Sequence, residues 1–154
     1  MAIKTTINIH KAIILKLDHA SNILHTSRMN IIRFLLKQYS EQNKKVIMFV
    51  TVKYQKRDDP SNWQPFHLYL REDEYEYCND FRKVYKKSLS LIISEAVKKY
   101  INLLILKMKN NIIQNIDSYR LKNYILSQRI NDGIIYRTYF WGLPDTETLM
   151  RYIS

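Results

Sequence analysis

The chain has little of what several classes of protein require. Its 154 residues include one cysteine, Cys78, which excludes an internal disulfide framework and fits a reducing compartment such as the cytosol. Gly133 and Gly142 are the only glycines, so a glycine-rich phosphate-binding loop is excluded. The longest apolar run, near residues 101–108, is far too short to span a bilayer. We therefore predict neither a disulfide-stabilised scaffold, nor a P-loop nucleotide site, nor a membrane-spanning segment.

Catalytic and metal-binding signatures are also missing. The motifs GxxxxGK, HExxH and GxSxG do not occur. Cys78 has no partner at ligand spacing, and the same holds for the four histidines, His10, His19, His25 and His67. The carboxylates of residues 72–76 are typical of the first turn of a helix, where they complement its dipole, and we interpret them as a solvated face. We predict no enzyme activity, no metal and no cofactor.

What the chain does have is positive charge. Lysine and arginine total 25 against 14 acidic residues, for a net charge of +11. Such an excess favours a polyanionic partner, either nucleic acid or an acidic membrane surface. A composition of 46% hydrophobic and 25% charged residues fits a soluble globular protein. We expect no signal peptide and no membrane partner, and a cytoplasmic location in association with the nucleoid.

The first residues alternate as a β-strand does. Period-2 geometry places Ile3, Thr5, Ile7 and Ile9 on one face and Lys4, Thr6 and Asn8 on the other. The first face suits a core. The second carries a cation, a hydroxyl and an amide, which suit the edges of DNA bases. A strand this short must pair with another strand to be stable, so the pattern predicts a two-stranded β-ribbon.

Two amphipathic helices are predicted next, over residues 11–25 and 27–39. Their apolar stripes are Ile13, Ile14, Leu17, Ala20 and Leu24, then Ile31, Ile32, Leu35, Leu36 and Tyr39. The strand at 4–9, the turn Thr26-Ser27 and the run 27–36 together resemble the ribbon–helix–helix repressors of the Arc and methionine-repressor type, over about a quarter of the chain. Two residues depart from the family pattern: His10 replaces the usual cap of the first helix, and His25 stands where a turn glycine is common.

A second copy of the pattern follows at an offset of sixty-one residues. Ser27 then corresponds to Ser88 and Tyr39 to Tyr100. The strand corresponds to residues 65–70, with Phe66, Leu68 and Leu70 inward and Pro65, His67 and Tyr69 outward. The first helix corresponds to residues 72–86, with a predicted stripe of Tyr75, Cys78, Phe81 and Tyr85. Because the resembled family normally needs two chains, we predict an intramolecular pseudo-dimer in which strand 3–9 pairs antiparallel with strand 66–70.

The remaining segments predict further strands. Residues 46–54 are β-branched and aromatic, and residues 56–62 are rich in turn formers. The strand at 46–54 has two alternative partners: strand 63–70, in competition with the ribbon, or strand 134–141 in an accessory sheet. We also expect a short helix over 119–126 capped at Asp117-Ser118, a turn at Asn131-Asp132-Gly133, and a last helical turn within 146–152.

The predicted fold class is mainly α with short β-strands, arranged as tandem ribbon–helix–helix units plus a small α+β extension. We divide the chain into a first unit at residues 1–42, a connector at 43–62, a second unit at 63–108 and a C-terminal extension at 109–154. The pseudo-dimer is expected to be monomeric, with further association on DNA left open.

The resemblance implies a sequence-specific transcriptional repressor of prokaryotic origin that binds double-stranded DNA and reads its major groove with the β-ribbon. The implied base-contacting residues are Lys4, Thr6, Asn8, His67 and Tyr69. The implied phosphate-contacting residues begin the second helix of each unit and are Ser27, Arg28, Met29 and Ser88.

Two alternatives stay open. The first is an antitoxin or plasmid-partition accessory protein, which has the same DNA-binding fold and binds a protein partner through the C-terminal extension. The second is a protein-interaction domain that keeps the architecture without binding DNA. The second strand is weak at Pro65-Phe66-His67, and this feature keeps the second alternative open.

Overall fold

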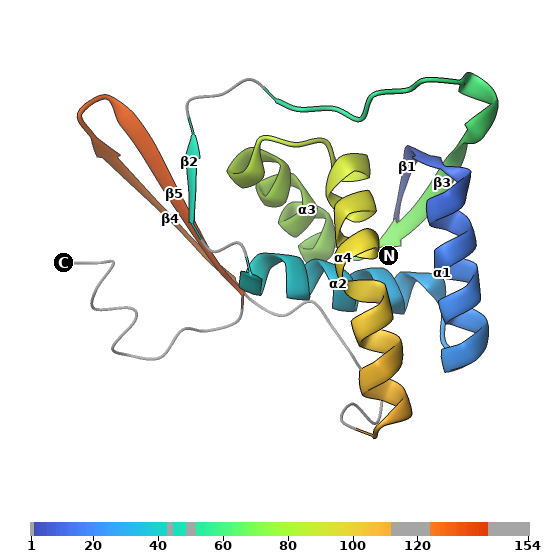
Figure 1. Ribbon diagram of the computed structural model, residues 1–154. Coiled ribbons are helices and arrows are strands. Elements are labelled where there is room, and N and C mark those ends of the chain that lie inside the picture. The colour runs from blue at the N-terminus through green and yellow to red at the C-terminus, as the bar shows by residue number, and fades with distance from the viewer. Residues whose placement is uncertain (1, 43–44, 49–51, 112–123, 142–154) are drawn as a thin grey trace.

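The order strand–helix–helix occurs twice in the N-terminal two-thirds of this mixed α/β protein (Figure 1). The computed structural model describes residues 2–42, 45–48, 52–111 and 124–141. Within these residues the elements are β1 (Ile3–His10), α1 (Lys11–Leu24), α2 (Arg28–Gln42), β2 (Lys45–Met48), the 3-10 helix η1 (Pro60–Asn62), β3 (Trp63–Leu70), α3 (Glu72–Tyr85), α4 (Leu89–Lys109), β4 (Tyr124–Asn131) and β5 (Ile134–Trp141). None of the described helices is long and apolar enough to cross a membrane.

The helix boundaries repeat at the sixty-one-residue offset. α3 spans the positions of α1 shifted by this offset, and α4 begins where the shifted α2 begins. Ser27 caps α2 by accepting a hydrogen bond from Asn30 N at 3.1 Å, and Ser88 caps α4 through Leu91 N at 3.2 Å. We call the segments β1–α1–α2 and β3–α3–α4 the two halves. The first helix of each half ends at a residue in the left-handed conformation, which is His25 (φ 52°) in one half and Lys86 (φ 51°) in the other. The predicted caps at the two serines are therefore confirmed.

His10 shows how α1 begins without the usual cap. Its Nδ1 accepts a hydrogen bond from Ala12 N at 3.0 Å, which satisfies one of the free N–H groups at the helix start. The corresponding residue of α3 is Arg71, whose side chain makes no capping hydrogen bond. The acidic first turn of α3 provides the dipole compensation that α1 lacks.

β1 and β3 form a two-stranded antiparallel sheet along their full length. Ile3 is opposite Leu70, Thr6 is opposite His67, and His10 is opposite Trp63. This is the pairing that the sequence predicts for strands 3–9 and 66–70. Of the two alternatives for residues 46–54, the structure shows the second, because β2 pairs antiparallel with β5.

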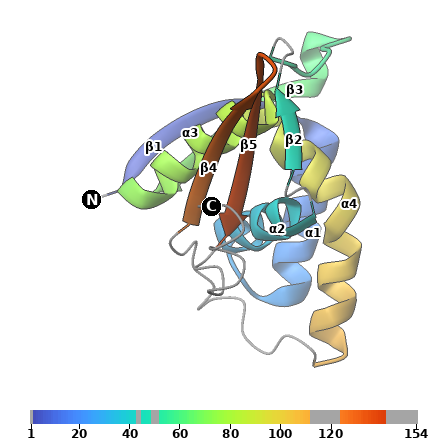
Figure 2. The same cartoon turned by 90° about the vertical axis from the view of Figure 1, so that its left-hand side faces the viewer.

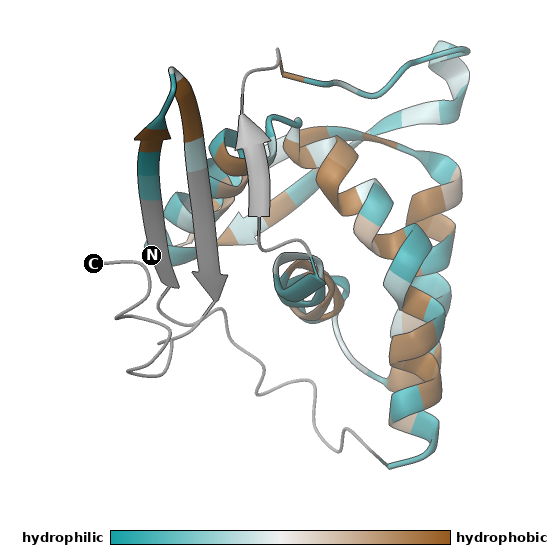
Figure 3. Cartoon of the chain, turned by 60° about the vertical axis from the view of Figure 1, so that its left-hand side comes forward, coloured by the Kyte–Doolittle hydropathy of each residue, from teal (hydrophilic) through white to brown (hydrophobic). Residues whose placement is uncertain are grey.

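One hydrophobic core lies between the inner face of this ribbon and the four helices. The ribbon contributes the buried Ile9, Phe66, Leu68 and Leu70. The stripes predicted for α1 and α2 are buried apart from Leu24, which is half-buried against the core. α2, seen nearly end-on at the centre of Figure 3, is apolar on one side and hydrophilic on the other.

The stripe predicted for α3 was wrong in one position. Tyr75 is 38% exposed, whereas Tyr77 and Val84 are buried beside the predicted Cys78, Phe81 and Tyr85. The inward position of the first turn is taken by Glu74, which is 2% exposed. The prediction of a solvated acidic face was therefore wrong for Glu74. It holds for the other three carboxylates of this run, Glu72, Asp73 and Glu76, which are exposed.

The second sheet has the strand order β2-β5-β4, and Figure 2 shows its three strands side by side in front of α3. β5 contacts both α2 and α3. The predicted turn is present, with Asp132 at φ 51° and Gly133 at φ 74° joining β4 to β5. Residues 124–126 are strand and not the predicted helix, because pairing with β5 outweighs their local helical spacing. The cap predicted at Asp117-Ser118 and the helical turn at 146–152 lie outside the described residues.

Candidate nucleic-acid interface

The five predicted base-contacting side chains lie on one face of the β1–β3 ribbon. The register places Lys4 opposite Tyr69, Thr6 opposite His67 and Asn8 opposite Pro65. All six of these residues are exposed, and their neighbours along each strand face the core. Two strands far apart in the sequence thus join their polar residues into a single surface, as the predicted pairing of strands 3–9 and 66–70 requires.

The centre of this face is the pair Thr6 and His67. The two residues correspond at the sixty-one-residue offset and also lie directly opposite each other in the ribbon. Thr6 Oγ1 and His67 Nδ1 are 2.9 Å apart and form a hydrogen bond. The two ends of the face, on either side of this pair, are chemically different. Lys4 lies opposite Tyr69 at one end, and Asn8 lies opposite Pro65 at the other.

At one flank of the ribbon lies the start of α2. Arg28 is exposed, with its guanidinium 4.8 Å from the centre of the Phe66 ring and 3.2 Å from the carboxylate of Asp18. Exposed ion pairs of this kind contribute about 0–1 kcal/mol, so Asp18 is a weak competitor for a phosphate. Met29 is half-buried and its side chain packs against the core.

At the other flank lies the start of α4, which has different contacts. The hydroxyl of Ser90 donates a hydrogen bond to the carbonyl of Asn8 in the ribbon. The backbone N–H of Ser88 donates to the carbonyl of Lys53 at 2.9 Å, so residue 53 of the connector covers this helix start. Leu89, which corresponds to Arg28, is buried. Ser88, a predicted phosphate contact, therefore lies beside the connector. The sequence did not indicate this contact between Ser88 and Lys53.

Two polar clusters hold the halves together behind the ribbon. Arg33 of α2 donates to the buried carboxylate of Glu74 in α3 at 2.7 and 3.3 Å. Its third contact, 2.8 Å long, is to Asn30 Oδ1. Because the two carboxylate oxygens accept from different guanidinium nitrogens, the pair fixes the rotation of α2 relative to α3.

The second cluster joins α2 to α4. Tyr39 donates to Glu95 Oε2 at 2.8 Å, and Lys87 donates to the same oxygen at 2.9 Å and to the Tyr39 hydroxyl at 3.0 Å. Burial opposes ionisation of Glu95, but the hydrogen bonds from Lys87 and Tyr39 outweigh it and lower its pKa. Burial, together with the Glu95 carboxylate, raises the pKa of Tyr39 well above its usual range. The cluster is a charged, hydrogen-bonded link between the halves.

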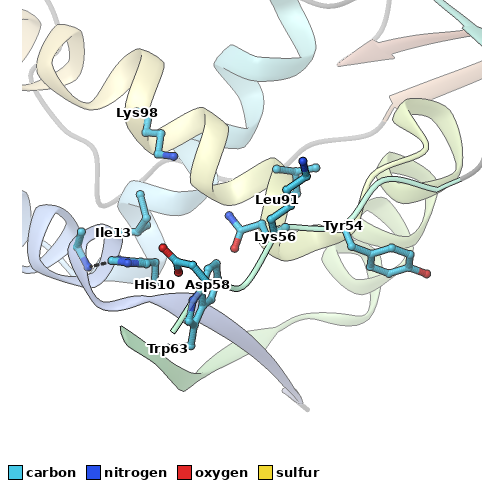
Figure 4. Close-up of a pocket in the computed structure, with 10 residues that line it drawn as sticks. His10, Ile13, Tyr54, Lys56, Asp58, Trp63, Leu91 and Lys98 are labelled. Atoms are coloured by element: carbon cyan, nitrogen blue, oxygen red, sulfur yellow. Dashed lines mark hydrogen bonds between the residues drawn. The ribbon is translucent and has the colours of Figure 1, made fainter. Parts of the chain in front are cut away.

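A cavity of about 490 Å³ lies at the end of the ribbon, between α1, α4 and the connector (Figure 4). His10 and Trp63 form part of its wall, with ring centres 5.3 Å apart at 82°. Figure 4 shows the carboxylate of Asp58 beside both rings. The backbone N–H of Asp59 donates to this carboxylate at 2.9 Å and lowers the pKa of Asp58. With Lys56 and Lys98 in the same wall, the cavity carries charges of both signs.

The remaining reactive residue types have other surroundings. Burial, reinforced by the nearby Glu74, raises the pKa of the Cys78 thiol to about 12, so the thiol is protonated at neutral pH. Within the described ranges no three histidine, cysteine or acidic side chains come together as a metal site. Comparison with known proteins identifies no relative: no protein-family model, no curated protein and no solved structure matches the chain.

Proposed function

We propose that this protein is a sequence-specific regulator that binds double-stranded DNA as a single-chain ribbon–helix–helix pseudo-dimer. In this proposal the β1–β3 ribbon enters the major groove. The observation that carries it is the single exposed face on which Lys4, Thr6, Asn8, His67 and Tyr69 lie together. The starts of α2 and α4 contact the two strands of the same ribbon, through Arg28 on Phe66 and Ser90 on Asn8.

The side chains on this face suit base edges. A lysine bonds the acceptors O6 and N7 of guanine, and an asparagine bonds N6 and N7 of adenine with both atoms of its amide. Because β1 and β3 present different residues at corresponding positions, the two halves of the ribbon read different bases. We expect a DNA site that is less palindromic than that of a homodimer. The net charge of +11 supports attraction to a polyanion.

The test is selection of bound duplexes from a random pool, followed by titration of the selected duplex with the parent chain and with Asn8→Ala and Lys4→Ala. Each variant should lose about 1–3 kcal/mol on the selected site and discriminate less at one base pair. Arg28→Ala should weaken all duplexes about equally and reduce the slope of log affinity against log salt by about one. Failure of the parent to bind any duplex at low salt would overturn the proposal, and base preference that depends on Arg28 and not on Asn8 would overturn the ribbon as the reading element.

A further inference from the structure

The connector crosses the turn between α3 and α4 as an extended segment, visible across the top of Figure 1. Lys53 N donates to Lys86 O at 2.8 Å, and Lys53 O accepts from Ser88 N at 2.9 Å. These two bonds hold residue 53 alongside residue 87 as a parallel bridge. The α1–α2 turn closes differently, through the local bonds Thr26 N to Ser21 O and Ile31 N to Ser27 O.

A chain of contacts runs from the ribbon to this segment. The hydroxyl of Ser90 is bonded both to the carbonyl of Asn8 and, at 3.2 Å, to Gln55 Oε1. Asn8 is one of the exposed ribbon residues, and Gln55 is next to Lys56 and Tyr54 in the connector. The connector thus contacts one end of the ribbon through the side chain of Ser90, besides leading directly into β3 at Trp63.

On its other side the connector borders a hollow of about 440 Å³, which we call the cationic groove. Its lining residues are Val52, Tyr54, Asn79, Arg82, Lys83 and Lys86. Every charged residue among them is a cation, in contrast to the cavity of Figure 4, which contains Asp58. Tyr54 is 69% exposed and offers a hydroxyl donor at the rim. Arg82 and Lys83 occupy the last turn of α3.

We propose that the cationic groove binds the phosphate backbone of the DNA duplex beyond the end of the ribbon, on the α4 side. The proposal rests on the proposed function and adds a contact that only one half of the molecule makes. Three cations that line one groove attract a polyanion, and an arginine, two lysines and a tyrosine hydroxyl all donate to phosphate oxygens. Duplex DNA is the occupant because Tyr54, which lines the groove, adjoins Gln55, and Gln55 is bonded to the same Ser90 hydroxyl that is bonded to Asn8 of the ribbon. The protected stretch of DNA is therefore longer on one side of the ribbon than on the other.

The test compares two double variants that each remove two positive charges from the last turn of a helix. Arg82→Gln/Lys83→Gln alters the groove, and Lys107→Gln/Lys109→Gln alters the far end of α4. On the selected duplex, the groove variant should bind about tenfold or more weakly in 0.1 M salt and lose about two units of the salt slope. Hydroxyl-radical footprinting should show that it loses backbone protection at one end of the site. The α4 variant should keep both the affinity and the footprint, and thermal melting checks that each variant is folded at the temperature of the binding assay.

The outcomes separate the two proposals. If the parent binds the duplex and the two double variants lose affinity equally, the groove is not a contact and the inference is overturned, while the ribbon assignment stands. A symmetric footprint of the parent would overturn the inference in the same way. If the parent binds no duplex at all, the proposed function fails and the inference fails with it.

Discussion

α2 begins with the exposed Arg28, whereas α4 begins with the buried Leu89, although the two residues correspond at the sixty-one-residue offset. The same contrast recurs behind the ribbon. Arg33 and Glu74 form an ion pair between the halves, while the corresponding positions hold Ser94 and Ile13, both buried. Equivalent backbone positions thus carry different chemistry on the two sides. The comparison shows that the two halves share their helix starts and strand pairing. The side chains at corresponding positions differ.

The largest effect should come from the buried ion pair. Glu74→Ile places at position 74 the residue found at position 13, but leaves the mostly buried Arg33 without its carboxylate. We expect a loss of about 3 kcal/mol in the free energy of unfolding, because a buried charge loses its partner. The double variant Arg33→Ser/Glu74→Ile reproduces the chemistry of the other half and should recover at least half of this loss.

Urea unfolding of the parent, the single variant and the double variant measures this directly. A double variant that is less stable than Glu74→Ile alone would show that the two positions do not accept the pair found in the other half. The two halves would then be equivalent in their backbone structure but not in the side chains that corresponding positions accept.

A smaller effect is expected at Glu95, whose corresponding residue in the first half is Phe34. The pKa of Glu95 is lowered in the folded chain from its ordinary value of 4.5. Its contribution to stability is therefore fully present above pH 4.5 and is lost as the pH falls through the lowered value. Glu95→Gln should cost about 1 kcal/mol at pH 7, because the hydrogen bonds from Lys87 and Tyr39 lose their charge assistance.

The difference between the parent and Glu95→Gln should shrink as the pH is lowered below 4.5 and the Glu95 carboxylate takes up a proton. Urea unfolding at pH 7 and at pH 3 provides the comparison. An equal difference at the two pH values would show that the charge of Glu95 does not contribute and that only its shape matters.

The smallest effect, and the one that tests the equivalence of the halves most directly, is at the two left-handed residues. His25→Gly and Lys86→Gly should each stabilise the fold by about 0.5 kcal/mol, because glycine adopts a positive φ without the steric cost that a side chain brings. His25→Ala, which keeps that cost, is the control. Thermal melting should show shifts of similar size at the two sites. A gain at His25 with a loss at Lys86 would mean that the connector, bonded to Lys86 O, makes the second turn different.

Many of the strands, helices and helix caps could be predicted from patterns of residues close together in the sequence. The alternation of Ile3, Thr5, Ile7 and Ile9, the spacing of the helical stripes and the capping serines each depend on residues a few positions apart, and the structure places them as expected. The exposed face of each ribbon strand could be predicted in the same way, because the two-residue alternation of a strand determines which of its side chains share a face.

Other features depend on partners that local pattern does not reveal. Glu74 has the sequence surroundings of an exposed helix start, and its burial follows from Arg33, forty-one residues away. Residues 124–126 have helical spacing, yet they form a strand because β5 pairs with them. The course of the connector over the α3–α4 turn is likewise set by backbone bonds to Lys86 and Ser88, which no composition or periodicity encodes.

The sequence by itself determined the repeated elements, their caps and the polar face of each strand, because these depend on the geometry of single strands and helices. Only the tertiary structure decided the exact register, which centres the joint polar surface on Thr6 and His67, since strand alternation does not determine how two strands are aligned with each other. It also decided that the two flanks of this surface differ. The connector is bonded to one helix start, and a backbone contact of this kind is made between distant segments only when the chain is folded.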